Sequence, residues 1–78
     1  MITKQDKSPV PDTLVEQIKR ARLKAKLSQD ELAVLASISR RPIYLLESGR
    51  GAIRLDTLLK ILDALGLTLR IEPKGRQP

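Results

Sequence analysis

The apolar residues between positions 12 and 65 recur at three- and four-residue steps, and polar or glycine signals interrupt this pattern at short intervals. Such spacing places side chains on one face of an α-helix, so each uninterrupted stretch predicts a helix with one buried side. The stretches are short, which restricts the chain to small helices around one core. The sequence therefore predicts an all-α fold of four to five helices. The clearest stretches are 12–26, 29–36, 40–48 and 55–65.

Each predicted helix has a defined set of residues that should face the core. These are Leu14, Val15, Ile18, Ala21, Arg22 and Ala25 in the first stretch, Leu32, Leu35 and Ala36 in the second, Ile43 and Leu46 in the third, and Leu55, Leu58, Leu59, Ile61, Leu62 and Leu65 in the fourth.

Polar residues and glycines mark where the helices begin and end. Ser28 followed three residues later by Glu31 predicts a capping box, in which each side chain satisfies a free amide of the first turn. Ser39 stands in the equivalent place before the next stretch, where Pro42 is tolerated because first-turn amides have no acceptor within the helix. The other expected boundary residues are Asp12 as a cap, and Gly49 and Gly66 as stops.

The charge of the chain is basic and concentrated in its middle. The 78 residues contain 15 Lys and Arg against 9 Asp and Glu, a net charge of +6. The segment from Lys19 to Arg54 carries all of this excess. A basic surface confined to one part of a small domain is typical of nucleic-acid binding. A solvated, charged surface without a ligand is the alternative.

Composition also excludes several kinds of chemistry. The chain has no His and no Cys, so it has no imidazole base and none of the usual ligands of structural zinc or iron–sulfur sites. We expect no metal, no cofactor and no enzymatic activity. No apolar run reaches the length of a membrane span or a signal peptide, so we expect no membrane association and a cytoplasmic location.

The second and third helical stretches are separated by a break of about three residues. Two short helices joined in this way have the geometry of a helix-turn-helix unit, whose second helix projects its first side chains into the DNA major groove. Arg40 and Arg41 occupy that first turn, and an arginine can pair with guanine O6 and N7 at once. Tyr44, the only aromatic residue, lies one turn further along the same face. Half-buried packing is the alternative role for this tyrosine.

Other polar residues around this helix are suited to the DNA backbone. Ser28 and Gln29 begin the preceding helix, where amides and short polar side chains can hold a phosphate. Ser39 precedes the second helix, and Arg50 and Arg54 flank the loop that follows it. We therefore predict that all five residues belong to a DNA-binding surface.

The segment LSQDELAVLASIS followed by RRPIYLLESGR resembles the helix-turn-helix domain of the Xre and Cro/C1 repressor family. The match extends through LDTLLKILDALG and covers about residues 12–66. This resemblance implies a lambda-repressor-like fold and sequence-specific DNA binding. It further implies that Gln29 contacts a phosphate, while Arg40, Arg41 and Tyr44 point toward base edges.

The same resemblance pairs Glu47 with Arg22 as a structural ion pair. The chain departs from the family pattern at Ser37 and Lys26, where glycine or asparagine is usual, so each should have a strained positive φ angle. Arg54 stands where a capping Ser or Thr is common, which should weaken the start of the last helix.

The period changes near the C-terminus, where apolar and polar residues alternate. Alternation predicts a half-buried β-strand over residues 67–72, ended by Pro73. No other segment predicts a strand, and a lone strand leaves its backbone polar groups unpaired. We therefore predict that this strand pairs with the same strand of a second copy in a homodimer, or else is a frayed, extended terminus. The expected interface residues are Leu67, Thr68, Leu69, Arg70 and Ile71.

A four-helix Xre-type domain followed directly by ALGLTLRIEP resembles HipB-type antitoxins of HipBA-like toxin–antitoxin modules. This resemblance implies a bacterial, nucleoid-associated homodimer that binds palindromic operator DNA, represses its own operon and holds a HipA-like kinase toxin. A free-standing or phage-type Xre regulator is one alternative, and a module whose basic face binds an acidic protein is another. Residues 1–11 are expected to form a flexible arm, and residues 73–78 a flexible tail.

Overall fold

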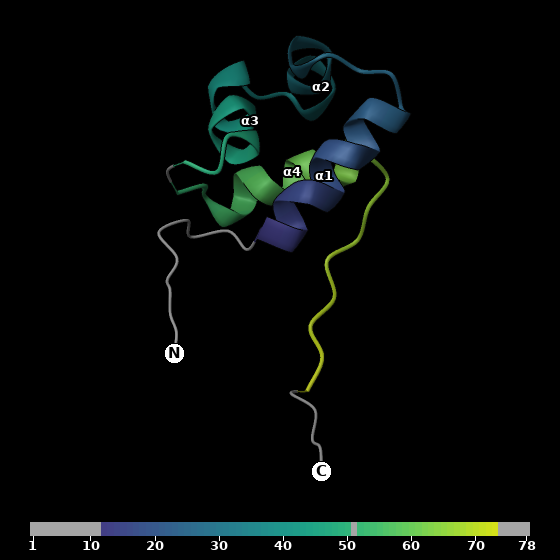
Figure 1. The fold of residues 1–78 in the computed structure, drawn as a ribbon, viewed down its shortest axis with the longest axis vertical. Helices are drawn as coiled ribbons and strands as arrows, with labels where there is room; N and C mark the ends of the chain where they lie inside the picture. Colours follow the sequence, from purple (N-terminus) through teal and green to yellow (C-terminus); the bar gives the residue numbers. More distant parts are fainter. Residues whose placement is uncertain (1–11, 51, 74–78) are drawn as a thin grey trace.

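The computed structural model describes residues 12–50 and 52–73 (Figure 1). The expected arm at residues 1–11 and the tail beyond Pro73 lie outside this part of the chain. The described residues form four α-helices and no strand, which confirms the all-α prediction. The helices are α1 (Asp12–Lys24), α2 (Gln29–Ala36), α3 (Arg40–Glu47) and α4 (Leu55–Ala64).

The four helices share one core, to which each contributes one fully buried branched side chain. These side chains are Ile18 of α1, Leu32 of α2, Ile43 of α3 and Ile61 of α4. Helix α2 packs against both α3 and α4, and α1 packs against α3. Burial of each such side chain stabilises the fold by about 1.5–3 kcal/mol relative to exposure. The core therefore fixes how α2 and α3 sit on the rest of the domain.

The boundaries of α2 and α3 follow the polar residues. Ser28 Oγ accepts a hydrogen bond from the Glu31 amide at 3.0 Å, and the Glu31 carboxylate accepts one from the Ser28 amide at 2.8 Å. The capping box is therefore present. Ser39 lies at the N-cap of α3 but makes no capping hydrogen bond. Helix α1 begins at Asp12. Asp12 is therefore the first residue of the helix and not, as expected, the cap residue that precedes it.

Two non-glycine residues adopt the left-handed conformation that the resemblance to the Xre family implies. Lys26, between α1 and α2, has φ 61°, and Ser37, between α2 and α3, has φ 59°. The left-handed conformation costs about 1–2 kcal/mol for a residue with a Cβ atom. The turns before and after α2 are thus kept although neither position carries the glycine that would relieve this strain.

Some apolar residues expected in the core are exposed. Leu35 is 58% exposed and Leu55 63% exposed, and Leu59 and Ala25 also face solvent. In α2 the buried side consists of Leu32, Ala33 and Ala36, so Ala33 takes the place predicted for Leu35. Helix α2 has apolar residues on most of its sides. The spacing of apolar residues therefore does not determine which side of α2 packs against α3 and α4. In the structure that side carries the small residues Ala33 and Ala36.

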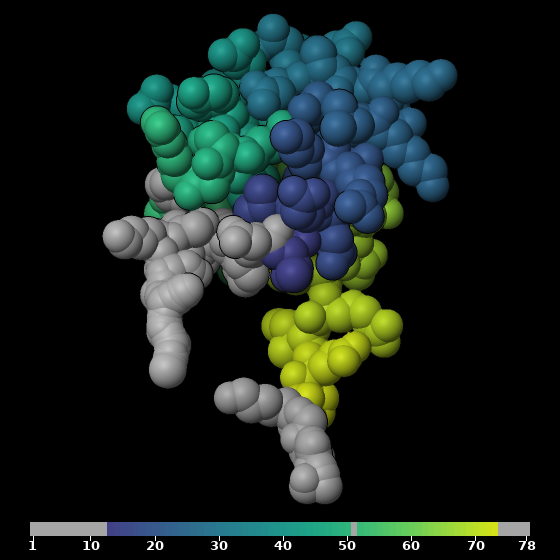
Figure 2. Space-filling model, in the orientation of Figure 1, coloured from purple at the N-terminus to yellow at the C-terminus, as the bar shows by residue number. Residues whose placement is uncertain are grey.

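Residues 67–73 are extended but form no strand in the described structure. The Leu67 amide donates to the Leu62 carbonyl at 2.8 Å, and the chain then runs away from the helices (Figures 1 and 2). Leu69 is 41% exposed and Ile71 is 95% exposed. Leu67 is 36% exposed, so the first apolar residues of the segment are partly covered in the single chain, whereas Ile71 has almost no cover. The described helices include none that is long and apolar enough to cross a membrane.

Candidate nucleic-acid interface

A buried ion pair connects α1 to α3. The Arg22 guanidinium donates from Nε to Glu47 Oε2 at 2.6 Å and from Nη2 to Glu47 Oε1 at 2.8 Å. The two side chains are only 10% and 4% exposed. The remaining terminal nitrogen, Nη1, donates to the Leu27 carbonyl at 2.6 Å, in the turn before α2. One arginine therefore joins α1, the α1–α2 turn and α3.

The environment of Glu47 keeps this carboxylate charged. Burial raises the pKa of Glu47. Hydrogen bonds from Arg22 and Gln29, together with the nearby charges of Arg22 and Lys19, lower the pKa by more than burial raises it. The net pKa of Glu47 lies below its ordinary value of 4.5. The hydrogen bond to Glu47 likewise raises the pKa of Arg22. Both partners are therefore ionised at neutral pH.

Gln29 extends this network to the start of α2. Its Nε2 donates to Glu47 Oε1 at 3.1 Å. A glutamine amide has two N–H donors and an acceptor oxygen, so this bond leaves polar capacity for a further partner. Gln29, which we predicted to bind a phosphate, is thereby held at the N-terminus of α2. No pattern in the sequence indicates that its amide contacts Glu47.

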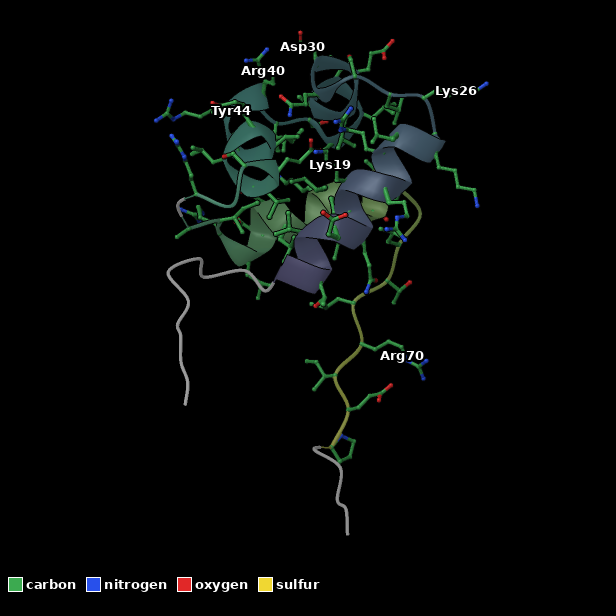
Figure 3. The ribbon with its side chains drawn as sticks, viewed as in Figure 1. Lys19, Lys26, Asp30, Arg40, Tyr44 and Arg70 are labelled. Atoms are coloured by element: carbon green, nitrogen blue, oxygen red, sulfur yellow. The ribbon has the colours of Figure 1, made fainter. Side chains whose placement is uncertain are left out.

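The first turns of α3 expose the residues predicted to reach DNA bases. Arg40 and Arg41 are exposed, and Tyr44 is 46% exposed one turn later. Figure 3 shows Arg40 and Tyr44 along the outer side of α3, turned away from the core. Ile43 and Leu46 occupy the opposite side of the helix and are buried. Burial of this apolar side thus determines which side of α3 faces solvent.

Three of the predicted site residues line one groove beside α3. Arg41 and Ser39 contribute from the start of α3, and Arg54 contributes from the N-cap of α4. The rest of the groove is formed by Pro42, Leu45, Ala52, Ile53 and Thr57. The Arg54 side chain contacts Asp56, with Nε 3.1 Å and Nη2 3.4 Å from its carboxylate oxygens. This contact raises the pKa of Arg54 and lowers that of Asp56.

The basic residues do not all gather around α3. Arg22 faces inward in the ion pair, and its charge is matched by Glu47. Lys19, Arg20 and Lys24 line a shallow pocket formed by α1 alone. Arg50 is exposed in the loop that follows α3, after Ser48 and Gly49. The described residues include no group of three or more side chains suited to hold a metal ion.

A charged contact between α2 and α3, which no pattern in the sequence predicts, also lies on this face. Asp30, the second residue of α2, lies with Oδ1 3.9 Å from Arg40 Nε. The two residues are ten positions apart and on different helices, so no local spacing rule connects them. Only the packing of α2 against α3 brings them together.

Comparison with known proteins identifies the class of this fold. A model of the helix-turn-helix family matches residues 18–71, which is more than half of the chain. The chain belongs to this family and carries a helix-turn-helix domain of Xre type.

One relative and two solved structures illustrate this similarity. An uncharacterized HTH-type transcriptional regulator of Haemophilus influenzae (strain ATCC 51907 / DSM 11121 / KW20 / Rd) is 35% identical over 60 residues, which are 77% of this chain and 61% of that protein. The chain thus spans less than two thirds of that relative. The HipB chain in a HipA–HipB–O2–O3 complex has a TM-score of 0.72 and 27% identity, covering 94% of this chain and all of HipB. A structure described as MDT protein gives the same values.

The depressed pKa of Glu47 predicts how stability depends on pH. Because the folded pKa lies below the unfolded value near 4.5, the stabilisation is complete above that pH and is lost as pH falls through the folded pKa. Urea unfolding of the Glu47→Gln variant should therefore show a shallower acid-induced loss of stability than the wild type. At neutral pH this variant should be less stable by about 3 kcal/mol, because Arg22 keeps a buried charge without its partner.

Glu16→Gln on the exposed side of α1 is the matched control and should follow the wild-type profile. If Glu47→Gln and the wild type have parallel pH profiles, Glu47 does not titrate as the ion pair requires.

Proposed function

We propose that this regulator is a sequence-specific repressor that reads operator DNA with α3. The observation that carries the proposal is the pair Arg40 and Arg41, exposed on the first turn of a helix whose opposite side is buried. A helix in the major groove contacts base edges with such N-terminal side chains, and arginine suits guanine. Tyr44 extends the same side toward the next bases.

The residues around α3 are suited to fix this helix on the DNA backbone. Gln29 lies at the start of α2 with an N–H beyond the one given to Glu47. Ser39 and Arg54 line the same groove as Arg41, and Arg50 follows α3. Phosphate contacts of this kind determine register and orientation, while base contacts determine sequence. Ser28 is placed beside Gln29, with its hydroxyl already engaged in the capping box.

We further propose that the protein binds a palindromic operator as a homodimer. Residues 67–71 are extended, alternate in polarity and leave Ile71 almost fully exposed in the single chain. Antiparallel pairing of this segment with a second copy would satisfy its backbone and cover its apolar side. Dimeric helix-turn-helix proteins place two recognition helices about one helical turn of DNA apart.

The likeness to HipB supports an antitoxin role. It covers the whole of the HipB chain in a complex that also contains HipA. On this basis we propose that the protein represses its own operon in the bacterial cytoplasm and binds a HipA-like kinase toxin. Co-expression with the product of the adjacent gene should yield a stable complex with a kinase-like protein. Purification without any such partner would favour the free-standing Xre regulator.

DNA binding is tested by titrating the protein against its own promoter duplex and a scrambled duplex at two salt concentrations. A specific repressor should prefer the promoter by roughly 10³-fold or more. Arg41→Ala should weaken promoter binding by about 1–3 kcal/mol and relax one base preference. Arg50→Ala should instead weaken both duplexes alike and reduce the salt dependence. Equal affinity of the wild type for the two duplexes would rule out sequence-specific repression.

The dimer is tested by removing residues 67–78, which leaves every residue of the buried core in place. Sedimentation at micromolar concentration should show a dimer for the whole chain and a monomer for the shortened one. The double variant Leu69→Asp/Ile71→Asp, which retains the backbone, should also shift toward monomer. An unchanged dimer in both cases would place the interface on the helices.

A further inference from the structure

We propose that Asp30 is a positioning residue that directs Arg40 toward bases and away from phosphates. The inference rests on the proposed DNA reading by α3. It concerns a carboxylate that lies beside the exposed arginines of α3, whose charge suits a polyanion. Figure 3 shows Asp30 and Arg40 at the same end of the molecule, where α2 and α3 begin.

The geometry of the contact determines which part of Arg40 is engaged. Asp30 Oδ1 lies 3.9 Å from Arg40 Nε, the nitrogen closest to the aliphatic chain. This separation exceeds hydrogen-bond length, so the contact is electrostatic. The two side chains are 55% and 76% exposed for Arg40 and Asp30, respectively. No hydrogen bond from either terminal nitrogen of Arg40 is found within the described part of the chain.

This arrangement leaves Arg40 with its two terminal nitrogens free for a base. Guanine offers O6 and N7 as a pair of acceptors, and the guanidinium fork can reach both without leaving Asp30. A DNA phosphate at the edge of the major groove also attracts this guanidinium. Contact with that phosphate would bring a second negative charge toward Asp30. The Asp30 carboxylate therefore disfavours contact of Arg40 with the DNA phosphates, whatever the sequence, but is compatible with contact of Arg40 with a guanine base.

The expected size of this effect follows from the exposure of the pair. Exposed ion pairs change binding or folding equilibria by a factor of about 1.5 to 5, because water and salt screen them. Asp30 should therefore weaken binding to unrelated DNA by a factor in this range. It should leave the complex with a preferred sequence almost unchanged. The consequence is a greater ratio of specific to non-specific affinity.

The test compares Asp30→Asn with Asp63→Asn, which removes the same charge from an exposed position on α4. The probes are a random-sequence duplex pool and a duplex enriched from that pool by the wild-type protein. Asp30→Asn should bind the random pool about 1.5- to 5-fold more tightly than Asp63→Asn, and with a steeper salt dependence. Both variants should bind the enriched duplex with similar affinity. Equal binding of the two variants to the random pool would overturn the proposal.

A second background tests whether Asp30 acts through Arg40. In the Arg40→Gln protein, Asp30→Asn should change random-pool binding no more than Asp63→Asn does. An effect of Asp30→Asn that persists without Arg40 would show simple repulsion of the phosphates and would also overturn the proposal. A wild-type protein that enriches no duplex would instead refute the proposed DNA reading itself, so the two failures are distinguishable.

Discussion

Arg22 and Glu47 place opposite charges inside a small domain, where the described core contains ten buried apolar residues. Removing each charge from water costs several kcal/mol, so such a pair is tolerated only when its geometry is good and its remaining donors and acceptors are used. Here Arg22 makes two hydrogen bonds to Glu47 and a third to the Leu27 carbonyl, and Glu47 accepts another from Gln29. The network connects three helices that each bury little apolar surface.

The proposed DNA-binding surface depends on this network. Helices α2 and α3 have eight residues each and are joined by three residues, one of which is strained at φ 59°. Helices this short are marginal in isolation, so their positions come from packing and from side-chain contacts between helices. Glu47 fixes the end of α3 to α1, while Ile43 and Leu46 bury its inner side. Arg40, Arg41 and Tyr44 are consequently presented outward from a helix that has little freedom to rotate.

Local signals in the sequence predict much of this fold. The Ser28–Glu31 capping box and the three-residue turn depend on neighbouring residues, and the structure contains both. The positive φ angles at Lys26 and Ser37, which the resemblance to the Xre family implies, are also present. The side of α2 that is buried depends on α3 and α4, and the spacing placed Leu35 inside where the structure exposes it. The contacts of Asp30 with Arg40 and of Gln29 with Glu47 join different helices, so no helical period reveals them. The C-terminal segment shows the same limit, because its alternation predicts a strand but identifies no partner for it, and the described chain forms no strand there.

The central claim is that Arg22 and Glu47 act as one unit in holding the helices together. A double-mutant cycle with Arg22→Met and Glu47→Leu, followed by urea unfolding at neutral pH, measures this directly. Each single variant should lose about 3–5 kcal/mol of unfolding free energy, because it leaves a buried charge without its partner. The double variant should recover much of that loss, since both charges are gone and apolar side chains fill the space. If the losses of the two single variants add in the double variant, the two residues stabilise the fold independently and the claim is wrong.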